Sequence, residues 1–216
     1  GHPYAVQHLK LVDIDTENRV VTGLSTNYVP NTTNGKFYFT NLVEEIDLPG
    51  ESWIDRKNGV VYFYPACDMA SAEVEVSEFN STAITMNGTE YVNFEDLSFG
   101  YTRANFIKAS KVSNITIDGC EFAHNSSTAI ELDGTDCVIK NCHIYDLGGV
   151  AGKGAITLSG GDRVKLISSG NKILNNRMHL GDRVYQVGQA PLIMVTGGVG
   201  HTIENNEIYN GSAYVA

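Results

Sequence analysis

The chain has 216 residues, of which 42% are hydrophobic and 19% are charged, so it is long enough to bury a core in one or two domains. Its 25 acidic residues outnumber its 15 basic residues, and the net charge of −10 argues against nucleic acid or an anionic membrane as a partner, because both select clustered lysine and arginine. No apolar run approaches the ~18 residues of a membrane-spanning helix. The 22 glycines and 5 prolines are typical of many short strands joined by tight turns.

The first third of the chain predicts two antiparallel hairpins. Residues 6–23 are apolar on both sides of a polar turn at 15–18. Residues 52–55 and 60–64 flank a turn that ends in Asn58-Gly59, a dipeptide that favours tight hairpin turns. We therefore expect residues 1–78 to form an aromatic-rich antiparallel region that caps the open end of the structure that follows.

From residue 79 onward the chain repeats a short apolar pattern. Isoleucines recur at spacings of 23, 23, 26 and 37 residues, each in an apolar segment followed by a turn, and a second apolar segment follows each turn. A repeat of this length without a helical period is typical of one coil of a solenoid. We expect an all-β, right-handed parallel β-helix over residues 79–216 that continues in a longer parent chain, because Ala216 falls inside a repeat. The isoleucines are Ile84, Ile107, Ile130, Ile156 and Ile193, and the turn positions four residues later are Gly88, Lys111, Gly134, Gly160 and Gly197. Glycine in four of these five places predicts a turn that needs positive φ or a close backbone approach.

One position of the second apolar segment changes from leucine to cysteine and then to asparagine along the chain. Stacking in register predicts that its amides bond to backbone or to each other inside the solenoid, as buried amides must. Its two cysteines would be neighbours, either as free thiols, which we favour, or as a disulfide. The four cysteines of the chain show no CxxC and no zinc spacing, so we expect no structural metal. The column is Leu97, Cys120, Cys142, Asn176 and Asn206, and the other cysteines are Cys67 and Cys137.

Six N-x-S/T sequons are candidate glycosylation sites if the chain is secreted by a eukaryote. A strand-rich protein with many Asn, Thr and Ser residues also produces sequons by chance, and both interpretations stay open. The sequons begin at Asn31, Asn80, Asn87, Asn114, Asn125 and Asn210.

Residues 41–51, 53–59 and 61–65 resemble a segment of secreted right-handed β-helix proteins related to β-helical glycoside hydrolases, the β-xylosidase-like and fucosidase-like groups. Residues 154–163 and 175–179 are similar to later segments of the same group. The resemblance implies a secreted, extracellular or cell-surface protein that acts on carbohydrate. The chain departs from the group after His179, where residues 181–186 replace the expected aromatic and basic residues. Group members also continue past Ala216, where further active-site acids would lie.

A pair of carboxylates is the machinery of glycoside hydrolysis, with a gap of about 5–10 Å between the two groups. Glu131 and Asp133 are two residues apart in a predicted strand, which places them on one outward face about 7 Å apart. The outward column through Glu131 contains Lys108 one coil away, and this lysine would keep Glu131 ionised. The same pattern also fits two solvated acids on an exposed strand. The full predicted column is Thr85, Lys108, Glu131, Thr157 and Met194.

Two insertions in the later coils supply the other candidates. Asp162 and Arg163 follow the Gly160-Gly161 turn and fall within the resemblance, although an Asp–Arg turn that only ties its own loop fits equally. His179 opens the second insertion and can carry a proton near neutral pH, or it can be a surface turn residue. Tyr101, Tyr145 and, in that insertion, Tyr185 can stack on sugar rings, although scattered tyrosines are also common on strand-rich proteins. We thus expect Asp162, Glu131 and His179 as catalytic residues around one groove, with Arg163, Asp133, Lys108 and Tyr185 binding substrate.

Two functions remain on the sequence alone. The first is a portion of a secreted, glycoside-hydrolase-like protein acting on polysaccharide or oligosaccharide, with no cofactor, although acidic loops of such a fold can hold Ca²⁺. The second is a non-catalytic carbohydrate-binding or structural solenoid module of a surface or filament protein. Expected partners are carbohydrate and further coils of the same parent chain, and not nucleic acid or membrane.

Overall fold

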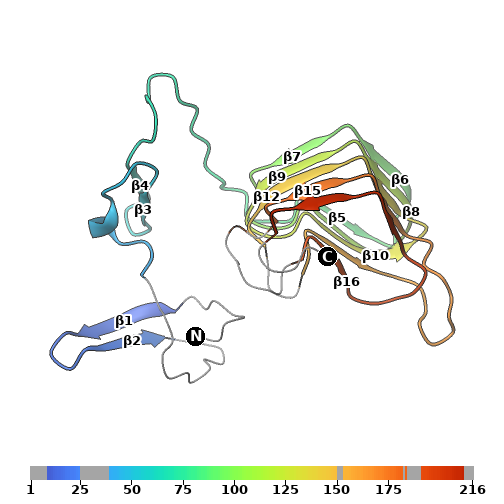
Figure 1. Ribbon diagram of the computed structural model, residues 1–216, viewed down its shortest axis with the longest axis horizontal. Coiled ribbons are helices and arrows are strands. Elements are labelled where there is room, and N and C mark those ends of the chain that lie inside the picture. The colour runs from blue at the N-terminus through green and yellow to red at the C-terminus, as the bar shows by residue number, and fades with distance from the viewer. Residues whose placement is uncertain (1–8, 25–38, 150–152, 182, 184–190, 212–216) are drawn as a thin grey trace. The chain divides into compact units, whose positions relative to one another are not determined.

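The computed structural model describes residues 9–24, 39–149, 153–181, 183 and 191–211 (Figure 1). Contacts between residues divide this part of the chain into two units, with the boundary between Glu75 and Val76. Among the described residues, no helix is long and apolar enough to span a membrane.

The first unit consists of two hairpins and one short 3-10 helix, η1 (Val43–Glu45). Strands β1 (Lys10–Asp15) and β2 (Val20–Leu24) pair antiparallel, as do β3 (Ser52–Asp55) and β4 (Val60–Phe63), so both predicted hairpins are confirmed. Each turn is closed by the aspartate that ends the first strand, which accepts hydrogen bonds from an asparagine three residues later. No described residue of this unit is buried. The capping role of the unit stays a prediction.

The second unit is a parallel β-helix whose coils present three faces (Figure 1). We call them the first, second and third face in the order in which each coil passes through them. The long strand β8 (Ile107–Asp118) bends and serves both the first and the second face. The first face otherwise holds β5 (Ile84–Asn87), β10 (Ile130–Thr135), β13 (Ile156–Ser159) and β16 (Ile193–Val195); the second face holds β6 (Glu90–Glu95), β11 (Val138–Lys140), β14 (Lys172–Leu174) and β17 (Thr202–Glu204); the third face holds β7 (Ser98–Gly100), β9 (Glu121–Asn125), β12 (His143–Leu147), β15 (Arg177–His179) and β18 (Glu207–Tyr209).

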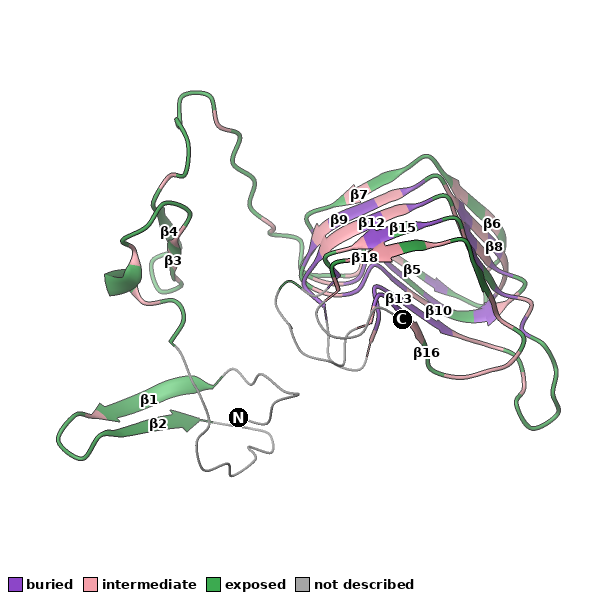
Figure 2. Cartoon of the chain, in the orientation of Figure 1, coloured by how far each residue is buried: buried purple, intermediate pink, exposed green. Residues whose placement is uncertain are grey.

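The register of the coils follows the repeat that the sequence predicts. Ile84, Ile107, Ile130, Ile156 and Ile193 are paired in one column, and the predicted outward column from Thr85 to Met194 is paired in the same strands. Inward side chains form one continuous core, which is buried in the middle coils (Figure 2). Ile107, Ile130 and Ile156 have no exposed surface. Burying a side chain of this size contributes about 1.5–3 kcal/mol, so the repeating isoleucines are a main source of stability.

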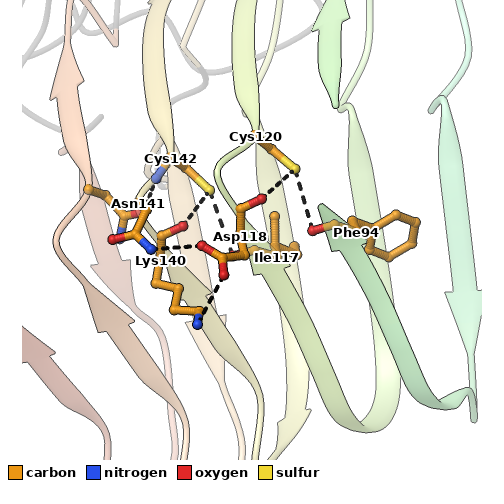
Figure 3. Close-up of polar contacts among 8 residues, drawn as sticks. Phe94, Ile117, Asp118, Cys120, Lys140, Asn141 and Cys142 are labelled. Carbon is orange, nitrogen blue, oxygen red and sulfur yellow. Dashed lines mark hydrogen bonds and ion pairs between the residues drawn. The ribbon is translucent and has the colours of Figure 1, made fainter. Parts of the chain in front are cut away.

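The cysteine and asparagine column lies at the bend between the second and third faces, as predicted. All three cysteines of the second unit are free and buried, which confirms the expectation of free thiols. The thiols of Cys120 and Cys142 donate to backbone carbonyls of their own and the preceding coil (Figure 3). Burial raises the pKa of Cys142 to about 12. This thiol is therefore unreactive at physiological pH.

The asparagines continue the column as a hydrogen-bonded ladder. Asn176 accepts from the Cys142 amide at 2.9 Å and donates to the Ile139 carbonyl at 3.0 Å, and its own amide N–H donates to the side chain of Asn206. Asn176 is 1% exposed, so its loss would leave two buried backbone groups without partners. Each such group costs about 1–3 kcal/mol.

We expect Asn176→Ala to lower the free energy of unfolding by about 2–4 kcal/mol. Chemical denaturation of the full chain measures this change. Asn93→Ala, at an exposed position of β6, is the matched control and should stay within about 0.5 kcal/mol. Equal effects of the two substitutions would contradict the ladder.

The turn column differs from its prediction at one position. Gly88 and Lys111 adopt positive φ, and Gly134 and Gly160 approach neighbouring backbone closely. A side chain at Gly197, however, would meet nothing within 4 Å, and the next residue, Gly198, takes the constrained position with φ of 97°. The expectation at Gly197 is therefore wrong by one residue, because the long preceding coil shifts the turn.

One predicted glycosylation position is also inaccessible. Asn125 is 1% exposed, and its amide donates to the carbonyls of Ala104 and Thr128. A glycan on this nitrogen would break both hydrogen bonds and enter the packed turn.

Candidate functional site

The outward surface of the third face is a regular grid of polar and aromatic side chains. Strand pairing aligns two columns across the five coils, the residues that follow the second column form a third set, and parallel strands set the spacing between coils at about 4.8 Å. The columns combine rings, carboxylates and guanidinium groups on one rigid surface. The first column is Ser98, Glu121, His143, Arg177 and Glu207; the second is Gly100, Ala123, Tyr145, His179 and Tyr209; the residues that follow the second column in each coil are Tyr101, His124, Asp146, Leu180 and Asn210.

This last set lies at the carboxyl ends of the third-face strands, within the last two residues of the strand or directly after it. All five residues have φ between 50° and 59°, a left-handed conformation that bends the chain away from the strand. Non-glycine residues rarely adopt it, and the cost of about 1–3 kcal/mol per residue must be offset by the surrounding structure. The repeated bend brings His124 and Asp146 to the same edge of the third face on successive coils.

The rings stack on one another from coil to coil. His179 lies between Tyr145, with ring centroids 5.3 Å apart, and Tyr209, at 4.7 Å, and both pairs are nearly parallel. Tyr101 stacks on His124 at 5.2 Å, and His124 meets Tyr145 edge to face at 5.6 Å. Because ring faces meet ring faces along the stack, the surface offers many ring edges with their hydroxyl and nitrogen atoms. Such edges hydrogen-bond to polar ligands.

Two carboxylates on adjacent coils contact these stacked rings. The Tyr145 hydroxyl donates to Glu121 Oε1 at 2.7 Å, and this hydrogen bond is the main reason why the pKa of Tyr145 is raised. On the other side, His124 Nδ1 lies 2.5 Å from Asp146 Oδ2, and the Arg183 guanidinium lies 3.1 Å from the same oxygen. Glu121 and Asp146 are therefore joined through Tyr145 and His124. We call these four residues the Glu121–Asp146 cluster.

The two carboxylates have different surroundings. Asp146 lies 3.1 Å from the fixed positive charge of Arg183. The partners of Glu121 are the hydroxyls of Tyr145 and Ser98, which are uncharged and can both donate and accept. One carboxyl group thus has a cationic partner, whereas the other has only neutral hydroxyl partners.

The predicted catalytic residues are not brought together. Among the described residues, Glu131, Asp162 and His179 share no hydrogen bond, ion pair or ring contact, and each lies in a different part of the coil. Glu131 is on the first face, His179 is on the third, and Asp162 follows the carboxyl end of β13. A single groove around these three residues therefore has no support from their contacts.

Glu131 lies in a local salt bridge. Lys153 Nζ lies 2.7 Å from its Oε2, and the Asn105 amide donates to the same oxygen. Burial acts to raise the pKa of Glu131, but Lys153, Lys108 and Asn105 together hold it below its ordinary value. The nearby Asp133 accepts from the Ser159 hydroxyl at 2.8 Å. These contacts fit a structural ion pair between Glu131 and Lys153 better than a proton donor.

Asp162 closes its own turn. Its Oδ1 accepts from the amides of Val164 and Lys165, at 2.9 and 3.0 Å, and its backbone pairs with Ile167. This is the loop-tying alternative that the sequence left open, and Arg163 is exposed beside it. Tyr185 lies outside the described residues.

Of the predicted site residues that the structure describes, His179 is the one whose ring stacks with Tyr145 and Tyr209 on the third face. Sequence reasoning had noted Tyr101 and Tyr145 only as scattered tyrosines and had passed over Glu121, His124, His143 and Asp146. The signal was present, because aligning the third-face strands on the Cys120–Cys142–Asn176 column places Glu121, His143 and Arg177 in one column.

The comparisons with known proteins agree with the fold. The family model of the right-handed beta helix region matches residues 54–208. The chain belongs to this right-handed β-helix family. The predicted fold class is thereby confirmed, including its handedness. Neither the curated proteins nor the solved structures gave a significant match.

Proposed function

We propose that this β-helix chain is part of a secreted, carbohydrate-active protein of the glycoside hydrolase type, and that its third face binds and cleaves the carbohydrate. The observation that carries the proposal is the Glu121–Asp146 cluster, in which two carboxylates with different surroundings flank a tyrosine and a histidine on adjacent coils. The resemblance of residues 41–65 to carbohydrate-active β-helix proteins points to the same class of substrate.

We infer that the cluster acts with a water molecule between its two acids. Glu121 and Asp146 are offset by three residues along the strand and by one coil across it, and they are joined through Tyr145 and His124. Carboxyl groups about 6.5–9.5 Å apart invert the anomeric centre, because a water molecule fits between the base and the sugar. We assign Asp146 as the base that activates this water, and Glu121 as the acid that protonates the leaving oxygen.

The remaining third-face residues would bind the sugar chain. Arg177 and Arg183 are exposed and Tyr145 and His179 are half-buried, so donors and acceptors for sugar hydroxyls line the face across two coils. A linear oligosaccharide that crosses the strands would meet a new set of these groups at every coil, about 4.8 Å apart.

The test is release of new reducing ends when the full chain is incubated with aryl glycosides and mixed polysaccharides. We expect hydrolysis of at least one glycoside, with inversion observed by NMR of the first product. A retained configuration would contradict the assigned roles. Absence of hydrolysis across the panel would contradict the enzymatic proposal.

A second function is favoured by the ring stacking itself. Rings that cover each other's faces also hold the coil edges together, as a purely structural solenoid module requires. Affinity electrophoresis in the same polysaccharides separates the cases. Retardation without hydrolysis supports a non-catalytic binding module, and neither retardation nor hydrolysis supports a structural one.

A further inference from the structure

We propose that His143 and His179 form a binding site for a divalent transition-metal ion of the nickel or copper type on the third face. The Nε2 atoms of the two imidazoles hydrogen-bond to each other at 3.0 Å from adjacent coils, and an ion bound by both nitrogens would displace the proton between them. Imidazole nitrogens are the preferred ligands of these ions. The inference concerns metal binding alone and does not depend on the proposed hydrolysis.

The separation of the two nitrogens sets the geometry of the ion. With metal–nitrogen bonds of about 2.0–2.1 Å, nitrogens 3.0 Å apart subtend an angle of roughly 95° at the metal, whereas a tetrahedral angle needs roughly 3.3 Å. An angle near 90° belongs to square-planar, tetragonal or octahedral coordination, which Ni²⁺ and Cu²⁺ adopt and structural Zn²⁺ sites do not. The ion would sit on the outer side of the pair, with water at its other positions.

The two rings are fixed in place before any metal binds. His143 stacks on Tyr145 of its own strand with centroids 4.3 Å apart, and His179 is held between Tyr145 and Tyr209. Strands β12 and β15, which carry the histidines, are paired in register. A preorganised pair loses little freedom on binding.

The charges around the pair are mixed. Arg177, which is paired in register with His143, opposes a cation, but its Nε lies 3.3 Å from Glu207 Oε2. Glu121 is the register partner of His143 on the other side, and Asp146 adds a negative charge nearby.

The other described histidines are engaged differently. His124 Nδ1 contacts Asp146, and both ring nitrogens of His201 have partners, Ser169 and the Gly197 carbonyl. No group of three or more candidate ligands occurs among the described residues, so the site rests on two protein ligands and solvent.

The test is calorimetric titration of the full chain with NiCl₂ and ZnCl₂ at pH 7.5. Every chain tested carries His2→Ala and His8→Ala, because these two residues have imidazoles and precede the described residues. We expect one Ni²⁺ per chain, bound at least as tightly as Zn²⁺. His143→Ala and His179→Ala should each weaken Ni²⁺ binding at least ~10-fold, while His201→Ala should not. Binding that neither substitution changes would overturn the site, and tighter binding of Zn²⁺ would overturn its geometry.

A measurement on the unsubstituted chain tests the site even if the substituted chains misfold. Ni²⁺ should protect His143 and His179 from modification by diethyl pyrocarbonate, detected by mass spectrometry, and should leave the reactivity of His124 unchanged. Equal modification of His143 and His179 with and without Ni²⁺ would contradict the proposal.

Discussion

Glu121→Gln is expected to lower the kcat for glycoside hydrolysis by about 10³-fold, within the 10²–10⁴-fold range of general acid catalysis. Glutamine keeps the size of the side chain and can still accept from the Tyr145 hydroxyl, but it has no proton to give to the leaving oxygen. Asp146→Asn should produce a similar loss, because an amide does not activate water. Steady-state kinetics on the glycoside found by the screen measure both effects.

The matched control is Glu131→Gln on the first face, which is also outward-facing and hydrogen-bonded. Since the cluster does not include Glu131, we expect its substitution to change kcat less than ~2-fold. A large loss in Glu131→Gln combined with normal turnover in Glu121→Gln would place the active site on the first face, as the sequence alone had suggested.

Gly160→Ala is expected to lower the free energy of unfolding by on the order of 5 kcal/mol, combining backbone strain with overpacking. Gly160 has φ of 141°, a conformation that side chains rarely permit, and a Cβ atom there would collide with the carbonyl oxygen of Gly134 one coil below. That oxygen also accepts from the Asn171 amide at 2.8 Å. Relieving the collision would therefore disturb a buried hydrogen bond between coils.

Gly197→Ala offers the comparison within the same turn column. Nothing lies within 4 Å of a Cβ atom at Gly197, so the expected change is within about 0.5 kcal/mol. Urea denaturation followed by circular dichroism measures both variants. A Gly160→Ala protein as stable as Gly197→Ala would mean that the coils do not approach each other at Gly160.

The solenoid could be predicted from the sequence because each coil repeats the same packing requirement. Every isoleucine of the first face must pack on its equivalent in the next coil, so spacing alone aligned Ile107 with Ile130 and Ile156. The register then followed for the outward residues between them. The constrained glycine of the last turn, Gly198, was not predicted, because the repeat spacing does not locate a turn to the exact residue in a coil that is 37 residues long.

The site was harder to predict because it depends on which outward column is functional. Glu131 and Asp133 offered an acid pair within one strand, and the sequence does not reveal that Lys153, 22 residues later, forms an ion pair with Glu131. The Glu121–Asp146 cluster joins residues 25 apart through a left-handed bend at His124. Nothing in the local sequence marks that bend, since His124 is neither glycine nor asparagine.

The most direct test of the third face as the carbohydrate site is an NMR titration of the Glu121→Gln chain with the oligosaccharide that the unsubstituted chain hydrolyses. The histidines report on separate regions, because His124, His143 and His179 lie on the third face, whereas His201 bonds to Ser169 between the first and second faces. The account predicts that the imidazole resonances of the three third-face histidines shift with saturation, while that of His201 stays unchanged. Saturable shifts that leave His124, His143 and His179 unmoved and appear instead on first-face residues would contradict it.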